Sequence, residues 1–347
     1  MEKIDLKSLN PEEITDFISE LGWETYRARQ LMSWLYQKRV SDFDSMTDLP
    51  LKLRKELKRN AIISSLIPHK VLLGEDGTRK YLFSLKNEGL IESVLIPEKD
   101  HLTLCLSTQL GCALKCRFCY TGKAGFIRNL TTAEIINQIE AVLNQLKDKE
   151  RLRNIVFMGM GEPLANYENT LKALEIIFHP LGFNFSHRRV TLSSAGLVPE
   201  LRRLGKDNPV NLAISLNAAD DETRSFLMPI NRKYPLAELL KVCKEYPLHH
   251  RKRITFEYVL IKGVNESLKD ARKLVDLLRR IKCKINLIPF NEHPGVNFKR
   301  PEKYRIDEFR DFLLSNGYTA IVRESRGSDI MAACGQLGGN IQLLSDN

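Results

Sequence analysis

The regular alternation of helical and extended segments after Gly122 constrains the fold of this 347-residue chain most strongly. Runs with strand-like patterning are separated by runs with apolar residues every three to four positions, and a capping box at Thr131 to Glu134 marks one helix start. Such alternation builds a parallel sheet or a full or partial α/β barrel, in which ligands bind beyond the carboxyl ends of the strands. Strands are expected over 154–159, 189–194, 211–217, 253–261 and 284–290, and helices from Thr131, near 167–178, over 267–281 and over 306–315.

Two regions of different patterning precede this α/β portion. Helical periodicity over 12–21, 26–38 and 51–59, broken by Gly22 and Pro50, predicts a small helical domain. Its many Lys and Arg residues could grip phosphates or form the solvated faces of short helices. A period of two then predicts strands over 71–73, 79–85, 89–96 and 102–106. The expected organisation is a helical domain at 1–60, a β extension at 61–101 and the α/β portion at 102–347.

The chain is basic, with 53 Lys and Arg against 43 Asp and Glu, a net charge of +10. A large basic enzyme often faces a polyanion such as nucleic acid, although a basic solvated surface explains the charge equally well. No apolar run approaches the roughly 20 residues of a membrane span, and the first nine residues are too charged for a signal peptide. A cytoplasmic protein without membrane attachment is expected.

Three of the seven cysteines, Cys112, Cys116 and Cys119, crowd into one loop just before the helix from Thr131. Three thiolates in one short loop can ligate three irons of a 4Fe–4S cubane and leave the fourth iron open to a substrate. The alternative is a zinc site, but tetrahedral zinc needs four ligands, and no CxxC or HxxxH pair completes the set.

This CxxxCxxC loop after the first strand of an α/β region resembles the radical-SAM superfamily. The resemblance narrows to the RlmN/Cfr family of RNA adenine-C2 methyltransferases and runs over nearly the whole chain, and Pro163 after Glu162 favours the RlmN branch. It implies a partial (β/α) barrel of the radical-SAM type. The blocks that carry it are 91–94, 105–109, 111–119, 159–164, 188–194, 215–217, 227–231, 286–291 and 329–337.

The resemblance implies a 4Fe–4S cluster whose open iron chelates S-adenosylmethionine, so that one electron splits this cofactor into a 5′-deoxyadenosyl radical. It also implies which residues contact S-adenosylmethionine, and these lie at predicted strand ends: Gly161, Glu162, Ser193, Ser215, Leu216, Asn217 and Asn291. Any one of these residues alone would be interpreted as an ordinary residue at the end of a strand. Two departures from the family pattern, Tyr120 in place of a small residue and Asn217 in place of a frequent His, affect only fine contacts.

Cys334 alone would be read as a small buried hydrophobe, but the family resemblance implies that it is methylated by one S-adenosylmethionine and loses a hydrogen atom to the radical from a second. The methylene radical adds to C2 of adenine. Cys105 is the matching thiol that releases the adduct by forming a disulfide with Cys334. Glu92 matches the base that removes the C2 proton, although it could equally be a half-exposed strand carboxylate. Cys243 and Cys283 fit no motif and are expected to be packing residues.

The implied substrates are an adenosine of 23S ribosomal RNA and one of the tRNA anticodon loop, with basic patches at Arg188–Arg189 and 249–253 as candidate contacts. Other implied partners are a one-electron reductant such as flavodoxin and a thiol reductant for the Cys105–Cys334 disulfide, acting on a monomer. Two alternatives stay open: methylation of C8 as in the Cfr branch, and an iron–sulfur RNA-binding protein without methyltransferase activity.

Overall fold

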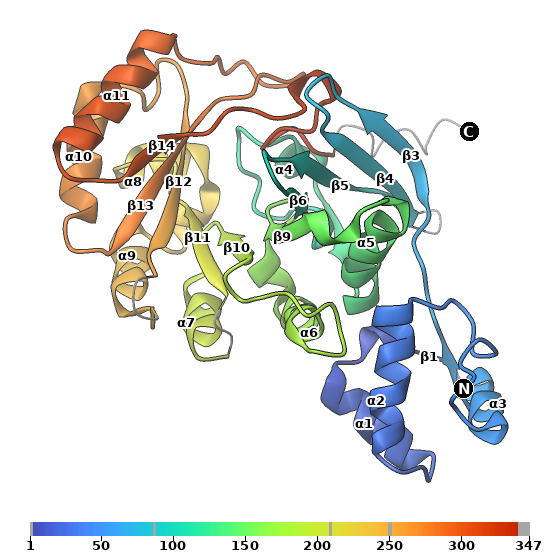
Figure 1. The fold of residues 1–347 in the computed structure, drawn as a ribbon. Helices are drawn as coiled ribbons and strands as arrows, with labels where there is room; N and C mark the ends of the chain where they lie inside the picture. The colour runs from blue at the N-terminus through green and yellow to red at the C-terminus, as the bar shows by residue number, and fades with distance from the viewer. Residues whose placement is uncertain (1–2, 86–87, 208–209, 249–251, 339–347) are drawn as a thin grey trace.

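The computed structural model describes residues 3–85, 88–207, 210–248 and 252–338, and the predicted patch residues 249–251 lie outside them. The described residues form one ten-stranded sheet in the order β14-β13-β12-β11-β10-β9-β6-β5-β4-β3. Figure 1 shows it as a strongly curved open wall. Its strands are β3 (Pro68–Leu73), β4 (Arg79–Leu85), β5 (Gly89–Pro97), β6 (Leu102–Cys105), β9 (Leu152–Phe157), β10 (Val190–Ser194), β11 (Asn211–Ser215), β12 (Ile254–Leu260), β13 (Cys283–Pro289) and β14 (Ala320–Val322).

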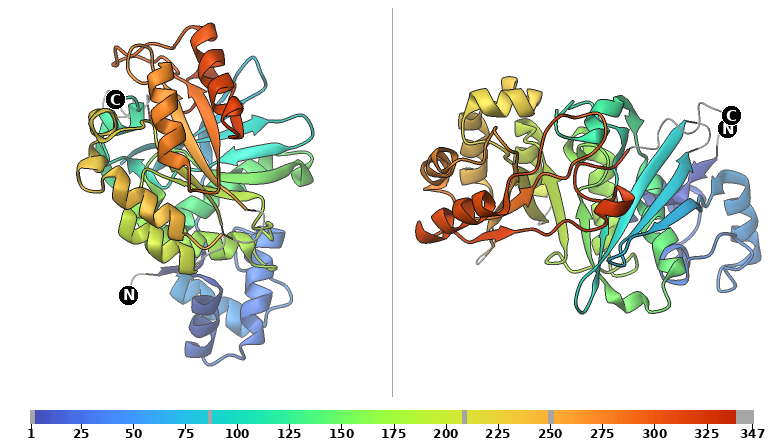
Figure 2. Two further views of the ribbon diagram at one scale, coloured as in Figure 1. Left: turned by 90° about the vertical axis from the view of Figure 1, so that its left-hand side faces the viewer. Right: turned by 90° about the horizontal axis from the view of Figure 1, so that it is seen from above.

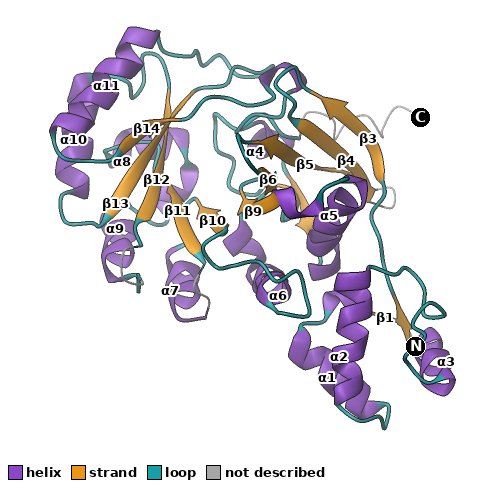
Figure 3. Ribbon diagram, in the orientation of Figure 1, coloured by secondary structure: helices purple, strands orange, loops and turns teal. Residues whose placement is uncertain are grey.

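The strands from β6 to β14 in this sheet are all parallel, and the sheet ends at β14 without closing. Helices cover the outside of the curve, as Figure 3 shows by colour. They are α5 (Thr132–Gln145), α6 (Tyr167–Phe178), α7 (Val198–Asp207), α9 (Leu236–Glu245), α10 (Leu268–Leu278) and α11 (Lys303–Ser315). Leu, Ile, Val and Phe side chains between helices and strands make one continuous core. The expected partial α/β barrel is confirmed.

The β extension is part of the same sheet. Strands β3, β4 and β5 pair antiparallel, and β5 pairs antiparallel with β6, the first barrel strand. Antiparallel neighbours need only short connections, and parallel ones need a crossover, so the hairpin-patterned segment lengthens the sheet at one edge without a helix. The view from above in Figure 2 shows these strands extending the wall beyond β6.

The N-terminal helices α1 (Pro11–Glu20), α2 (Tyr26–Met32) and α3 (Leu51–Asn60) form a separate unit beside α5 and α6 (Figure 1). Helix α2 runs on as the π-helix η2 (Ser33–Lys38), so the expected single helix over 26–38 changes its hydrogen bonding midway. The unit is tied to the barrel by Lys7, whose buried Nζ lies 2.5 Å from Glu140 Oε2 and 3.0 Å from Asn137 Oδ1 on α5. Within the described ranges, no helix is long and apolar enough to cross a membrane.

Candidate active site

The three clustered cysteines lie in a loop between strand β7 (Gln109–Gly111) and helix α4 (Tyr120–Ala124). Strand β7 pairs with β8 (Phe126–Asn129), so both ends of the loop are fixed. The Cys112 amide donates to Gly125 O at 2.8 Å. Gly111 must be glycine here, because a Cβ would stand 1.9 Å from Gly125 O. The loop therefore returns tightly on itself and holds the cysteines together.

Cys112, Cys116 and Cys119 all line one cavity, whose empty space including its open mouth is about 980 Å³. Burial raises the pKa of the Cys112 thiol to about 12 and that of Cys116 well above its usual range. Thiolates here therefore need positive charge for stability, which iron supplies. No three His, Cys, Asp or Glu side chains of the described residues converge on a single-metal position. A 4Fe–4S cubane does not need its ligands to converge on one point, because each thiolate binds a different iron. The three cysteines fit this requirement.

The same cavity contains most residues that the resemblance assigned to S-adenosylmethionine. Its lining includes Gly161, Glu162, Ser193, Ser215, Asn217 and Asn291 together with the three cysteines. Leu216 differs, because its side chain is buried outside the lining and its backbone bonds to Glu257 and Arg224. The parallel strands explain this convergence: Ser193, Ser215 and Asn291 lie at or just beyond the carboxyl ends of β10, β11 and β13.

Glu162 is the buried carboxylate of this cavity. Its oxygens accept from the backbone N–H groups of Ala195 at 2.7 Å and Leu164 at 3.1 Å. Burial raises its pKa to about 7, and these hydrogen bonds oppose the rise. A bound ammonium group would favour the ionised form further. Gly161, at φ 96, has no room for a side chain, because a Cβ would lie 2.4 Å from Gln109 Cβ.

Two residues that the sequence analysis missed, one half-buried and one fully buried, organise the cavity walls. Glu257 on β12 accepts from Ser193 Oγ at 2.7 Å. Glu257 lines this cavity and also a second, larger cavity that Cys105 lines, and desolvation raises the pKa of its carboxyl. Arg224 on α8 (Asp221–Leu227) is fully buried and donates to Leu216 O at 3.0 Å and Ala195 O at 2.7 Å, holding the ends of β10 and β11. An acidic residue inside the otherwise apolar segment 254–260 was a signal for Glu257; nothing in the sequence signalled Arg224.

Asn217 adopts a left-handed backbone at φ 60. Its Oδ1 accepts from the Val259 amide at 2.9 Å, and its Nδ2 contacts Met228 Sδ at 3.2 Å. Asn tolerates this backbone region better than most residues. The side chain is therefore already engaged in holding β11 against β12.

Cys334 lies where the first cavity meets a second, larger one, and Cys105 lines the second. The Cys334 side chain is exposed to this space although cavity walls surround it, whereas Cys105 is buried. Burial and then the carboxyl of Glu257 raise the pKa of the Cys334 thiol to about 11, and burial followed by Cys334 raises the pKa of Cys105. Residues 229 positions apart in the chain are thus brought to one cavity. Cys243 and Cys283 are buried in the core, as expected for packing residues.

Two hydrogen bonds join the start of α4, directly after the cluster loop, to the loop that carries Cys334. The Tyr120 amide donates to Gly335 O at 2.7 Å, and Thr121 Oγ1 donates to Leu337 O at 2.7 Å. Asn291 Nδ2 donates to the carbonyl of Cys334 itself at 3.0 Å. The loop that carries this thiol is therefore held by groups from the start of α4 and from the residue Asn291 just beyond β13.

Glu92 on β5 is buried, and neither cavity includes it in its lining. Its Oε2 accepts from the Gly338 amide at 3.1 Å and lies 3.7 Å from Lys80 Nζ. Its Oε1 is buried without a hydrogen-bond partner among the described residues, an arrangement that is uncommon in folded proteins. Desolvation raises its pKa, and Lys80 opposes the rise. Val94, two residues along the same face of β5, does line the second cavity.

Comparison with known proteins agrees with this arrangement. Residues 106–278 match the Radical SAM superfamily, and residues 4–63 match the ribosomal RNA large subunit methyltransferase N-terminal domain. The dual-specificity RNA methyltransferase RlmN of Geobacter sulfurreducens is 54% identical over 98% of this chain and 94% of its own length. RlmN of Syntrophotalea carbinolica is 53% identical over 98% of this chain and 91% of its own length.

The solved structure of a radical SAM methyltransferase from Sphaerobacter thermophilus is 43% identical and superposes with a TM-score of 0.89, covering 96% of this chain and 98% of that one. Both the expected family and the expected fold class are therefore confirmed. The shared fold, the cysteine loop and the full-length similarity together show that this chain belongs to the RlmN family of radical-SAM RNA methyltransferases.

Proposed function

We propose that the chain methylates C2 of an adenosine in 23S ribosomal RNA and of one in tRNA, with Cys334 carrying the methyl carbon. The observation that supports this most directly is the position of Cys334, which opens into the cluster cavity on one side and into the cavity that holds Cys105 on the other. A thiol that must meet S-adenosylmethionine and then an RNA base needs access to both.

Cys112, Cys116 and Cys119 would hold the 4Fe–4S cluster, and Glu162, Ser193, Ser215 and Asn291 would orient S-adenosylmethionine beside it. Once bound, the cluster and this cofactor supply one-electron cleavage of a carbon–sulfur bond. The chain's own contribution is to exclude water and to aim polar groups at the cofactor. Burial favours the neutral form of Glu162, so the ammonium group of a bound cofactor would stabilise its ionised form.

The covalent steps fall to Cys334 and Cys105. The Cys334 sulfur takes a methyl group by displacement from one S-adenosylmethionine, losing its proton and releasing S-adenosylhomocysteine. A hydrogen atom then passes from this methyl group to the second S-adenosylmethionine after its one-electron cleavage, and the resulting carbon radical on Cys334 adds to C2 of adenine. The adduct radical loses one electron, which the cluster would take back, and the C2 proton, which Glu92 accepts. The Cys105 thiolate attacks the Cys334 sulfur, the carbon–sulfur bond breaks with its electrons on carbon, and carbon takes a proton.

This scheme needs partners that supply electrons. A one-electron donor such as flavodoxin would serve the cluster, and a thiol reductant would reopen the Cys105–Cys334 disulfide after each turnover. We further propose that the chain acts as a cytoplasmic monomer. Its helical unit at 1–60 would contact RNA, the strands at 61–101 would brace the barrel, and 102–347 would carry the chemistry.

The test is mass spectrometry on protein purified with its cluster, followed by incubation with RNA. One added methyl on the peptide that contains Cys334, transferred to an adenosine and located at C2, is the expected result. An unmodified Cys334 in active enzyme, or a methyl found at C8 of adenosine, would overturn the proposal in its present form.

A further inference from the structure

Apart from the two cavities described above, a groove lies at the junction between the N-terminal unit and the barrel. The chemistry proposed above does not use it. Its empty space is about 1010 Å³. Arg39, which ends η2, forms one side. The start of β9 at Arg153 and the loop 180–189 ahead of β10 form the other. We call it the junction groove.

The junction groove is positively charged. Four cations, Arg39, Lys149, Arg153 and Arg189, line it against the single carboxylate of Glu150. The salt bridges found among the described residues involve none of the four cations. Cations that are held together without carboxylate partners favour a bound anion, and guanidinium groups suit phosphate geometry.

The junction groove also contains aromatic surface on a fixed loop. Phe183 packs on the buried Tyr36, with ring centroids 5.6 Å apart, and Phe185 is half-buried in the groove wall. The amides of Phe183 and Phe185 bond to the carbonyls of Ile176 and Ile177 at the end of α6, at 3.2 and 2.9 Å. Cations interleaved with aromatic rings are typical of surfaces that bind single-stranded nucleic acid, since phosphates meet the charges and bases stack on the rings.

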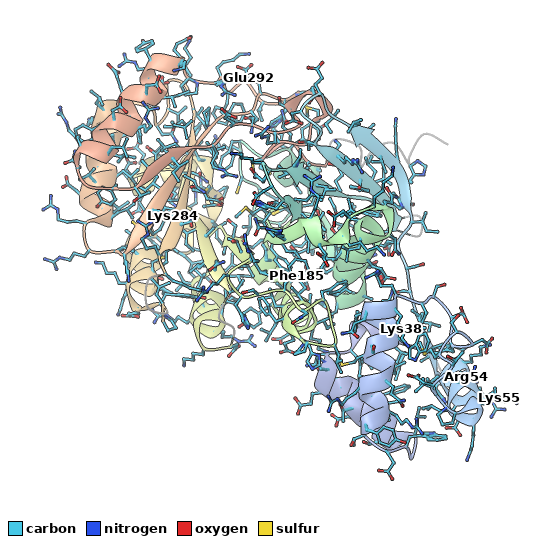
Figure 4. The ribbon with its side chains drawn as sticks, viewed as in Figure 1. Lys38, Arg54, Lys55, Phe185, Lys284 and Glu292 are labelled. Atoms are coloured by element: carbon cyan, nitrogen blue, oxygen red, sulfur yellow. The ribbon has the colours of Figure 1, made fainter. Side chains whose placement is uncertain are left out.

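The junction groove meets the larger cavity that Cys105 and Cys334 line, which we call the catalytic cavity, at Arg189, a residue that lines both. Arg189 Nη1 lies 3.4 Å from Asn154 Oδ1, in the wall of the catalytic cavity. Further basic residues of that cavity, Arg253 and Lys284, stand at the amino ends of β12 and β13. In Figure 4, the labelled Phe185 lies between Lys284 on the barrel and Lys38 on the N-terminal unit.

We infer that the junction groove holds the RNA strand that flanks the target adenosine, with its phosphates on Arg39, Arg153 and Arg189 and one neighbouring base stacked on Phe185. This inference rests on the proposed function and adds to it a second base-binding position outside the reaction cavity. A base that is withdrawn from its stack for chemistry leaves its neighbours unstacked, and an aromatic ring beside the cavity replaces the lost stacking.

The charge contribution is tested with Arg39→Gly combined with Arg153→Gln. Arg39 sits at φ 54, so glycine removes its charge while easing the backbone. Binding to an RNA hairpin with single-stranded flanks is measured over a range of salt concentrations. Loss of two phosphate contacts lowers the slope of log affinity against log salt by about 1.4. The matched control, Arg279→Gln just after α10 with Lys303→Gln at the start of α11, changes net charge equally and leaves the slope unchanged.

The stacking contribution is tested with Phe185→Leu, which keeps apolar packing and removes the ring. Affinity for the flanked hairpin falls by about fivefold or more, and affinity for a hairpin without flanks stays the same. S-methylation of Cys334 stays at the wild-type level in every groove variant, which shows that the barrel is intact. Wild-type slope and affinity in the groove variants overturn the inference. If the groove variants show the predicted losses but the wild-type enzyme never methylates the flanked RNA, the proposed function alone is overturned.

Discussion

Lys80 Nζ lies 3.7 Å from Glu92 Oε2, with both side chains buried between β4, β5 and the segment 331–338 that carries Cys334. Desolvation acts on the two groups in opposite directions, lowering the pKa of Lys80 and raising that of Glu92. The attraction between the two charges opposes both shifts, so each charge makes the other less costly to bury. The protonation of Glu92 therefore depends on Lys80.

Replacement of Lys80 by Met is expected to raise the pKa of Glu92 further, because the positive charge that opposes desolvation is lost and only the Gly338 amide still favours the ionised form. Glu92 accepts a proton only when ionised, so the acidic limb of the pH–rate profile for RNA methylation moves to higher pH. The measurement is the single-turnover rate against pH. Lys70→Met on the exposed part of β3 is the control. An unmoved limb, with Glu92→Gln as active as wild type, would show that Glu92 is not the base.

Replacement of Cys105 by Ala is expected to stall the enzyme after it joins the RNA. Without the attacking thiolate, the thioether to Cys334 does not break, so a protein–RNA complex resistant to denaturation accumulates. Denaturing gels and peptide mapping detect it. The complex disappears when Cys334 is also replaced, and Cys243→Ala, which alters a buried core thiol, leaves turnover normal. Normal turnover by Cys105→Ala contradicts the assignment.

Replacement of Cys112, Cys116 and Cys119 by Ala is expected to abolish binding of about four irons per chain, since each thiolate ligates one iron of the cubane. Iron analysis and absorbance after anaerobic reconstitution measure this. Cys283→Ala retains the full iron content, because this thiol is buried in the core away from the loop. A triple variant with wild-type iron and absorbance would refute the ligand set.

Replacement of Arg224 by Met is expected to destabilise the fold by about 3 kcal/mol, because two buried carbonyls, Ala195 O and Leu216 O, lose their charged donor. Urea denaturation measures the free energy of unfolding. Arg202→Met on α7, an exposed residue, changes it by about 0.5 kcal/mol or less. A loss for Arg224→Met no larger than that of the control would show that the carbonyls find other partners.

The barrel strands could be predicted because their apolar runs are bounded by polar segments: the expected strand over 284–290 is β13 at Cys283–Pro289. Helices α7 and α9 were missed, since α9 follows Pro235 without a side-chain cap and α7 contains Gly205. Strands β7 and β8 are three and four residues long, and their pairing depends on the cluster loop between them. Such short elements carry no period of their own.

The residues of the site likewise include some that could be predicted from the sequence and some that could not. A loop motif such as the three cysteines is local, so the proposed ligation of a cluster could be predicted from its spacing. Cys105 and Cys334 are isolated in the chain, and only the family resemblance paired them. Arg224 supports the site through carbonyls of two other segments, and such a role depends on tertiary packing that no single stretch of sequence encodes.

The bonds from Tyr120 and Thr121 to the Cys334 loop have a consequence for how the enzyme matures. Under the proposed function, the cysteine loop that precedes these two donors would hold the cluster, and the donors tie it to the segment that carries Cys334. By reciprocity, whatever favours one of the two loops favours the other. We therefore expect cluster assembly to favour the position of Cys334 from which, under the proposed function, it would take its methyl group.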